Sequence, residues 1–467
     1  MADRRQAKTF PGPARRSPHA LSTLERQDEA FSVEASQALG GASWQKERRL
    51  SAVERYFAAP WPTPADEAWR YSRVDQLHLA RFAPAAAATE QASMPPLPAA
   101  AHALIDRIGE RAGFALTIDG RPHEIDLGEE ASRFGVRLGR ASTQPGAEEL
   151  IGQVKAGFRA PDATDATDEL AEAFAGDAVV LTVPAGVALD RPLVIVNLLG
   201  VSHDSLEAGP AFFPRTFVSL GEDASATVVE LFVSGEGAIL TCPVTELDVA
   251  QAGRLSYTSV QQLGRRTWQL GHSWSRAGRD AHLKLFTASL GGEYARTRTD
   301  SRLEGQGGSA ELLAAYLGDG DQVHDFRTLQ EHDAPRTTSD LVFKGAVGGS
   351  ARAVYTGLIR MCRGARGANA FQTNRNLVLS EGASAYSVPN LDIDENDVRC
   401  SHASAVGPID PEQRFYLQSR GIPAEVAERL ILLGFFEELL ERAEPAVRDH
   451  VAATARSRLS SLTGEES

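Results

Sequence analysis

The sequence predicts a mainly β protein with a parallel β-helix core and helical regions on both sides. Short apolar segments divided by Gly, Asn, Asp and Ser fill residues 176–407, almost without helical periodicity. Small-residue turns at 224–226, 253–255, 280–282 and 308–310 recur every roughly 27–30 residues. Regular self-similarity of this kind is typical of a solenoid, in which each coil buries its apolar face against the next. A β-sandwich is the alternative, but few Asn-Gly or Asp-Gly hairpin turns favour it.

The segments before the core predict an N-terminal arm and a helical domain. We expect residues 1–43 to be a disordered arm and residues 44–175 to form a helical or mixed domain. Leu50, Val53 and Phe57 recur at helical spacing, and the proline-rich run at 60–64 ends that helix because proline cannot continue it.

Residues 408–467 predict a helical C-terminal domain. Asp410 is a good N-cap, Pro411 suits the first helical position, and Gly421 stands where a helix-ending glycine belongs. A second helix follows Pro423, and its apolar stripe is wider than one packing partner usually requires. We expect this region to dock a partner protein, through Arg420, Val426, Leu430, Leu433 and Phe436.

Composition bounds the functional class. The chain has 467 residues, of which 62 are acidic and 48 basic, so its net charge of −14 argues against nucleic acid as a partner. No segment approaches the roughly 20 apolar residues of a membrane helix. Three scattered cysteines, Cys242, Cys362 and Cys400, indicate a reducing compartment, and we expect a cytoplasmic protein.

Cys400 and His402 are the candidate metal ligands. Residues at i and i+2 of a strand share one face, so a thiol and an imidazole could serve one iron site. The alternative interpretations without metal are a small buried hydrophobic residue for Cys400 and a packed or exposed strand residue for His402. Three cysteines cannot supply a four-cysteine cluster, so other ligands would come from a partner. Cys242 and Cys362 fit core or corner positions better.

Other polar groups point to structural roles. His324 and His332 lack a recognised ligand spacing, so we expect them to stabilise turns. The acidic residues before Cys400 could attract iron, although a solvated loop is the simpler account. The sequence has no Gly-x-x-x-x-Gly-Lys-Ser/Thr loop, so no ATP site is assigned to this chain.

A series of motifs resembles the SufB/SufD family of iron–sulfur cluster assembly proteins. Their order and spacing carry the resemblance: His-Asp-Phe-Arg-Thr at 324–328, His332, Phe-Lys-Gly at 343–345, Arg-Ala-Val-Tyr-Thr-Gly-Leu-Ile at 352–359, Gln-Thr-Asn-Arg-Asn-Leu-Val-Leu-Ser at 372–380, Ser-Val-Pro-Asn-Leu-Asp-Ile at 387–393 and Asp-Val-Arg-Cys-Ser-His at 397–402. The Trp-Pro-Thr-Pro segment at 61–64 and the Cys-Ser-His form are most similar to the SufD branch. Ala403 stands where that branch commonly has glycine.

The resemblance implies a right-handed parallel β-helix within a complex. Its partners would be a SufB-like paralogue at the β-helix end and two copies of the SufC-type ABC ATPase at the C-terminal helices, with a homodimer when the chain is alone. The resemblance also implies a link to iron entry and a transient iron or iron–sulfur cluster shared with the SufB-like partner.

The expected function is a non-catalytic scaffold subunit of the SUF assembly machine. One alternative is a SufB-like chain that holds the cluster itself. The other is a pectate-lyase-type β-helix enzyme, with Asp392, Asp394 and Asp397 as calcium ligands and Arg399 as base. Only the β-helix prediction supports that enzyme, and a fold alone does not establish a function.

Overall fold

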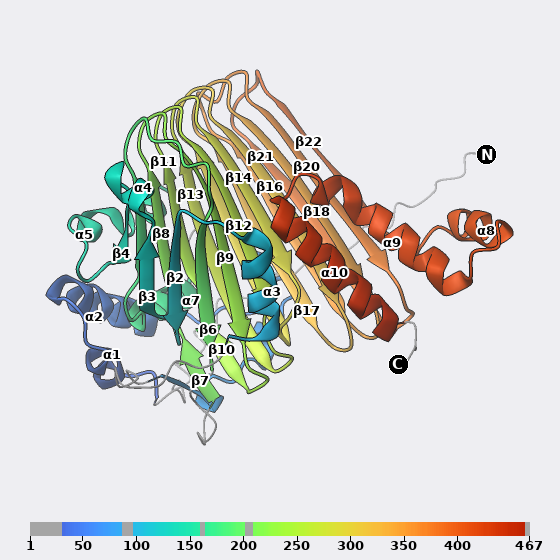
Figure 1. Cartoon of the computed structure of the whole chain (residues 1–467), viewed down its shortest axis with the longest axis horizontal. Coiled ribbons are helices and arrows are strands. Elements are labelled where there is room, and N and C mark those ends of the chain that lie inside the picture. The colour runs from blue at the N-terminus through green and yellow to red at the C-terminus, as the bar shows by residue number, and fades with distance from the viewer. Residues whose placement is uncertain (1–29, 86–96, 159–163, 201–208, 463–467) are drawn as a thin grey trace, which may run out of the picture.

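A computed structural model describes residues 30–85, 97–158, 164–200 and 209–462, and it confirms the parallel β-helix. About seven turns of parallel β-solenoid form two long sheets (Figure 1). One sheet has ten strands, in the order β3 (Arg121–Leu127), β2 (Gly113–Ile118), β6 (Leu193–Leu199), β9 (Ser225–Ser234), β12 (Arg254–Gln262), β14 (His282–Ser289), β16 (Ser309–Gly318), β18 (Thr338–Val347), β20 (Asn369–Val378) and β22 (Arg399–Gly407).

The second sheet has twelve strands and faces the first. Its main path is β4 (Arg137–Arg140), β5 (Val179–Val183), β8 (Arg215–Leu220), β11 (Val244–Val249), β13 (Thr267–Ala277), β15 (Tyr294–Leu303), β17 (Val323–His332), β19 (Arg352–Met361) and β21 (Ser384–Ile393). A side branch holds β1 (Phe82–Pro84), β7 (Gly209–Phe212) and β10 (Ile239–Thr241).

The repeat predicted from the sequence matches the register in which successive parallel strands pair. Arg254 pairs with His282, His282 with Ser309, and Ser309 with Thr338, so the predicted turns lie where β12, β14 and β16 begin. The described strands pair in parallel, except at β2–β3 and β4–β5, which are antiparallel. Parallel pairing with short turns excludes the hairpin-connected sandwich.

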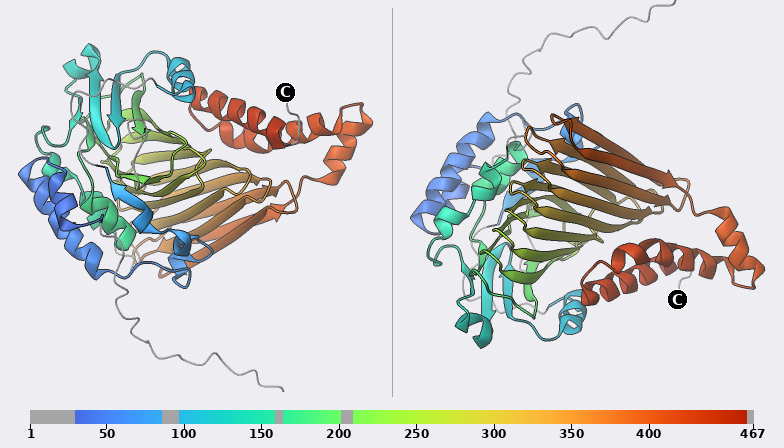
Figure 2. Two further views of the ribbon diagram at one scale, coloured as in Figure 1. Left: turned by 90° about the horizontal axis from the view of Figure 1, so that it is seen from below. Right: turned by 90° about the horizontal axis from the view of Figure 1, so that it is seen from above.

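Helices cover the outer faces of both sheets. On the twelve-stranded sheet lie α1 (Val33–Ala38), α2 (Ser43–Ala58), α5 (Ala147–Leu150), α6 (Gln153–Ala156) and α7 (Ala166–Ala173), with the short 3-10 turns η1 (Glu67–Trp69), η2 (Val74–Gln76) and η3 (Leu79–Arg81). On the ten-stranded sheet lie α3 (Ala99–Ile108), α9 (Ala424–Leu440) and α10 (Pro445–Leu462), while α8 (Pro411–Ser419) projects from the outer end of α9 (Figure 2). The short α4 (Glu129–Arg133) follows β3. No helix of the described chain is long and apolar enough to cross a membrane.

Two N-terminal boundaries differ from the expectation. Helix α1 lies inside the segment expected to be a disordered arm, because Ser32 caps it and the buried Phe31 ring meets Phe174 edge-on at 5.3 Å. Residues 1–29 of that arm lie outside the described chain. Strands β2 to β4 join the two sheets although they precede residue 176, so the solenoid starts earlier than predicted. Their antiparallel pairing hides them from a repeat search.

The interior is built from columns of stacked side chains. The column through Val228, Tyr257, Leu285, Leu312 and Leu341 is buried and almost wholly apolar. A second column has a close fit between a large and a small residue: the Tyr316 ring lies over Gly345, where a Cβ would be only 1.8 Å from a ring carbon. The Tyr316 hydroxyl donates to Asn376 Oδ1 at 2.6 Å, so the ring is fixed at both ends.

We expect Gly345→Ala to destabilise the protein by about 2–4 kcal/mol, because the added methyl group must displace a buried, hydrogen-bonded ring. Urea unfolding monitored by circular dichroism measures the change. Gly434→Ala is the matched control: this glycine is exposed in α9, its Cβ would meet nothing within 4 Å, and the change should stabilise by about 0.5–1 kcal/mol. Equal unfolding midpoints for the two variants would contradict the packing described.

Candidate functional site

The C-terminal end of the solenoid is open. Strand β21 pairs only with β19, and β22 pairs only with β20, so each sheet ends in a strand with one unpaired edge. In the described chain no helix or strand covers these edges, and Figure 2 shows the last strands at the free end of the stack. Unpaired edges present rows of N–H and C=O groups that readily pair with another chain.

The same end exposes apolar side chains of the interior. Leu391 and Ile393 of β21 stack on the buried Ile359 and Met361 of the preceding turn, yet both are exposed because no further turn covers them. Val406 of β22 is exposed in the same way. Terminal repeats of a solenoid normally carry a polar cap for solubility. The uncapped apolar end is therefore a candidate interaction surface.

Cys400 and His402 lie on β22, within this open end. Cys400 is in register with Ala370 and His402 with Gln372, so both point to the interior face of the strand. Cys400 packs against an apolar cluster, and burial raises the pKa of its thiol to about 11. His402 is exposed. No group of three His, Cys, Asp or Glu residues in the described chain is arranged to hold a metal ion, so the pair is incomplete by itself.

Two polar side chains that sequence reasoning missed lie beside this pair. Gln372 is 1 % exposed, and neither its Oε1 nor its Nε2 has a hydrogen-bond partner. The buried Oγ of Ser387 on β21 is also without one. Buried polar atoms are normally hydrogen-bonded, so these atoms are available to a further polar group. The motifs at 372–380 and 387–393 contain both residues, but a sequence cannot reveal a missing partner.

The remaining cysteines and histidines have structural positions. Cys242 is fully buried, and Cys362 follows β19, where its N–H donates to the carbonyl of His332 at 2.9 Å. His332 contacts Thr337 Oγ1 and Ser339 Oγ, both at 2.8 Å, and this ties the turn between β17 and β18. Burial lowers the pKa of His332 to about 4. His324 is likewise buried, with Ser289 Oγ 2.9 Å from its Nδ1.

The acidic residues proposed as calcium ligands do not form a metal site. Asp392 Oδ2 lies 3.6 Å from Arg360 Nε on the outer face of β21, and Asp397 accepts a 2.8 Å hydrogen bond from Arg366. Asp394 follows the end of β21, where its N–H donates to the carbonyl of Met361. Arginines, not a shared cation, therefore neutralise Asp392 and Asp397, and the polysaccharide-lyase alternative loses its ligands.

The predicted docking stripe of α9 divides between two surfaces. Phe436 is buried and Leu433 half-buried against the ten-stranded sheet, so Phe436 is not available to a partner. Lys344 Nζ donates to the carbonyl of Phe435 at 3.0 Å and pairs with Glu438 at 2.8 Å, which fixes this half of α9. A single helix sequence does not distinguish these two faces.

The free part of the stripe lies next to α8. Val426 and Leu430 are exposed, as predicted, and Arg420 lies 5.1 Å from the Tyr416 ring. Phe415 and Tyr416 of α8 are exposed too, and sequence reasoning did not single them out. The sequence signal that could have identified Phe415 and Tyr416 is a pair of aromatic residues close to the apolar stripe of α9. We call Phe415, Tyr416, Val426 and Leu430 the α8–α9 patch.

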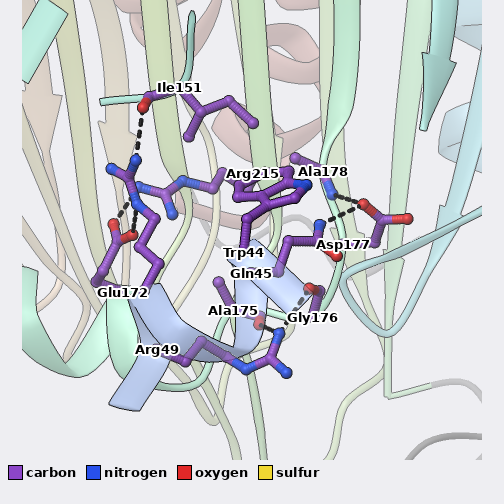
Figure 3. Close-up of a pocket in the computed structure, with 11 residues that line it drawn as sticks. Trp44, Gln45, Arg49, Ile151, Glu172, Ala175, Gly176, Asp177, Ala178 and Arg215 are labelled. Atoms are coloured by element: carbon purple, nitrogen blue, oxygen red, sulfur yellow. Dashed lines mark hydrogen bonds and ion pairs between the residues drawn. The ribbon is translucent and has the colours of Figure 1, made fainter. Parts of the chain in front are cut away.

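A pocket at the opposite end holds charges that are already paired (Figure 3). Glu172 of α7 accepts short contacts from Arg48 and Arg215, and Arg215 also lies 3.7 Å from Glu246. The two guanidinium groups hold the pKa of Glu172 well below its usual range, although burial alone would raise it. These ion pairs anchor α2 and α7 to the sheet.

We expect Cys400 to react slowly with iodoacetamide at neutral pH, because the thiolate is the nucleophile and burial disfavours it. In Cys362→Ser protein the other cysteine, Cys242, is fully buried, so labelling reports Cys400. The rate should rise roughly tenfold per pH unit between pH 7 and 10. A rate that levels off below pH 9, measured by mass spectrometry, would show that the thiol has an ordinary or lowered pKa.

Comparisons with known proteins identify the family of this chain. The family model described as "SUF system FeS cluster assembly, SufBD core domain" matches residues 203–435. An iron–sulfur cluster assembly SufBD family protein of Mycobacterium tuberculosis is 35% identical over 282 residues, which cover 58% of this chain and 70% of that protein. The iron–sulfur cluster assembly protein SufD of Escherichia coli is 28% identical over 436 residues, 92% of this chain and 94% of that protein. SufD of Bacillus subtilis is 27% identical over 89% of this chain and 94% of its own length. The chain therefore belongs to the SufBD family of iron–sulfur cluster assembly proteins.

Proposed function

We propose that this chain is a non-catalytic scaffold subunit of the cytoplasmic SUF machine, which pairs with a SufB-like paralogue and docks a SufC-like ABC ATPase. The observation that carries the proposal is the open end of the solenoid. Two edge strands, exposed interior apolar residues and the orphaned amide of Gln372 all meet there. A second β-solenoid can cover all three at once, because its own edge strands bring backbone donors and acceptors.

The proposed cargo is iron or a nascent iron–sulfur cluster. Cys400 and His402 supply two ligands on one face of β22, and a cluster requires about four. The SufB-like partner would contribute the others, so the cluster forms between the two chains. Because the Cys400 thiol is protonated at neutral pH, metal binding there must release a proton.

The ATPase would dock at the α8–α9 patch. Its four exposed residues lie on α8 and the N-terminal half of α9, whereas Lys344 contacts Phe435 and Glu438 in the C-terminal half of α9. Arg420 borders the patch and can pair with an acidic partner group. The sequence has no phosphate-binding loop of its own, so ATP hydrolysis would be the partner's contribution.

The same open end would allow self-association. When the SufB-like chain is absent, a second copy of this chain can pair its edge strands there. We expect such a homodimer to dissociate when the SufB-like partner is added, because both would use β21 and β22.

In the reconstituted three-component complex, we expect His402→Ala to lower bound iron and cluster yield at least fivefold, because one ligand is lost. Complex assembly should persist, since the imidazole is exposed. Iron analysis and visible absorption of the purified complex measure the effect. His123→Ala is the control, because His123 is an exposed strand histidine on β3, at the other end of the solenoid. Unchanged iron and cluster yield in His402→Ala would remove this residue from the mechanism.

We expect Phe415→Asp to weaken ATPase binding at least tenfold, because a buried charge replaces an aromatic anchor. Binding to the SufB-like chain should be unchanged. Phe134→Asp provides a matched control, since Phe415 is 71% exposed and Phe134 is 54% exposed beside α4. Analytical ultracentrifugation with each partner measures both affinities. If Phe415→Asp binds the ATPase as tightly as the control does, docking uses another surface.

A further inference from the structure

A ladder of charged side chains, linked by ion pairs, crosses the outer face of the twelve-stranded sheet. Successive strands from β11 to β21 place Asp248, Arg276, Arg302, Glu331, Arg360 and Asp392 in one register column. Neighbouring side chains in such a column are about 4.8 Å apart. Each therefore interacts with the side chains before and after it.

Ion pairs between opposite charges link the members of the ladder, and Glu304 bridges its two consecutive arginines. Asp248 and Arg276 approach to 2.7 Å, and Glu304 lies between the two arginines, 3.6 Å from Arg276 and 3.4 Å from Arg302. Arg302 then lies 3.3 Å from Glu331. Arg276 and Arg302 are register neighbours of like charge, and Glu304 offsets their repulsion by pairing with both. From Arg302 to Asp392 the signs alternate. The ladder thus favours the parallel register of this sheet over a shifted one.

The last two steps lead to the open edge. Arg360 is shared between Glu331 at 3.7 Å and Asp392 at 3.6 Å, so one guanidinium group serves two carboxylates. Asp392 belongs to β21, the edge strand, and its side chain is 53% exposed. The next position in the column, one strand spacing beyond Asp392, belongs to whichever strand pairs with β21.

We infer that Asp392 selects the partner strand by presenting an unfinished ion-pair ladder, and that the strand pairing with β21 carries an arginine or lysine opposite it. This inference rests on the proposed pairing with a SufB-like chain. A basic side chain continues the alternation, whereas an acidic one would place two carboxylates side by side. Backbone hydrogen bonds between strands do not depend on the identity of the side chains. The ion pairs of the ladder therefore determine which strand pairs with β21, and in which register.

The test compares three variants in binding to the purified SufB-like chain. Asp392→Asn should weaken binding roughly 3–30-fold, and Asp392→Lys more strongly, because a like charge then opposes the partner. Asp394→Lys is the control: the same change of charge two residues further on, at an exposed position just beyond the strand. Titration calorimetry at 50 and 300 mM salt should show a smaller salt dependence for Asp392→Asn than for wild type.

The outcomes separate the inference from the function beneath it. If the wild-type chain fails to bind the SufB-like chain, the proposed function is wrong and the inference falls with it. If wild type binds, and Asp392→Lys binds no worse than Asp394→Lys, the pairing stands and the charge-selection idea is overturned. If Asp392→Lys loses only self-association, measured by sedimentation, the ladder selects a second copy and not the SufB-like chain, which also overturns the inference.

Discussion

The structure depends on one constraint: each turn of a parallel ladder is satisfied only by the turn that follows it, and the stack must stop somewhere. At the N-terminal end each sheet also finishes in an edge strand, but the last pairing there is antiparallel and helices flank it. Strands β3 and β4 pair antiparallel with β2 and β5, and helices α2 and α7 pack over the first turns of the twelve-stranded sheet. At the C-terminal end of the described chain, the edge strands β21 and β22 are paired in parallel and interior apolar side chains are exposed. The two ends are thus chemically different, and the C-terminal end is the candidate surface for an added strand.

The side chains within a stacked column also change from turn to turn along the axis of the solenoid. The column that runs from Val228 to Leu341 is almost wholly apolar, and then it continues with Gln372 and ends in His402. Neighbouring columns change in the same direction, with Asn374 and Asn376 bonded around the Tyr316 hydroxyl. Polar groups are costly inside a core unless paired. The first turns also bury polar groups, around Glu230, but there Asn197, Thr216 and Tyr257 bond its carboxylate. At the last turns Gln372 has no such partner, and His402 lies at a surface.

Much of this fold was predictable because the repeat is encoded by residues that are close together in the sequence. Turn spacing and strand length gave the solenoid, and capping residues gave α8 and its start at Asp410. The i, i+2 relation placed Cys400 and His402 on one face. The N-terminal strands were missed because their antiparallel pairing breaks the repeat. Phe436 was misassigned, and Gln372 overlooked, because exposure and hydrogen-bond partners depend on residues about 30 to 100 positions away, which no local pattern reports.

The positions of the two ends of the solenoid along the chain also determine the order in which they are synthesised. Synthesis delivers the N-terminal helices and the closing strands first, and each later turn can then fold on a finished template. The adhesive edges β21 and β22 emerge near the end, shortly before the C-terminal helices. An unpaired edge is most dangerous while a chain is incomplete and crowded on the ribosome. Leaving it to the last turn confines its exposure to a nearly finished molecule, at the moment when assembly can begin.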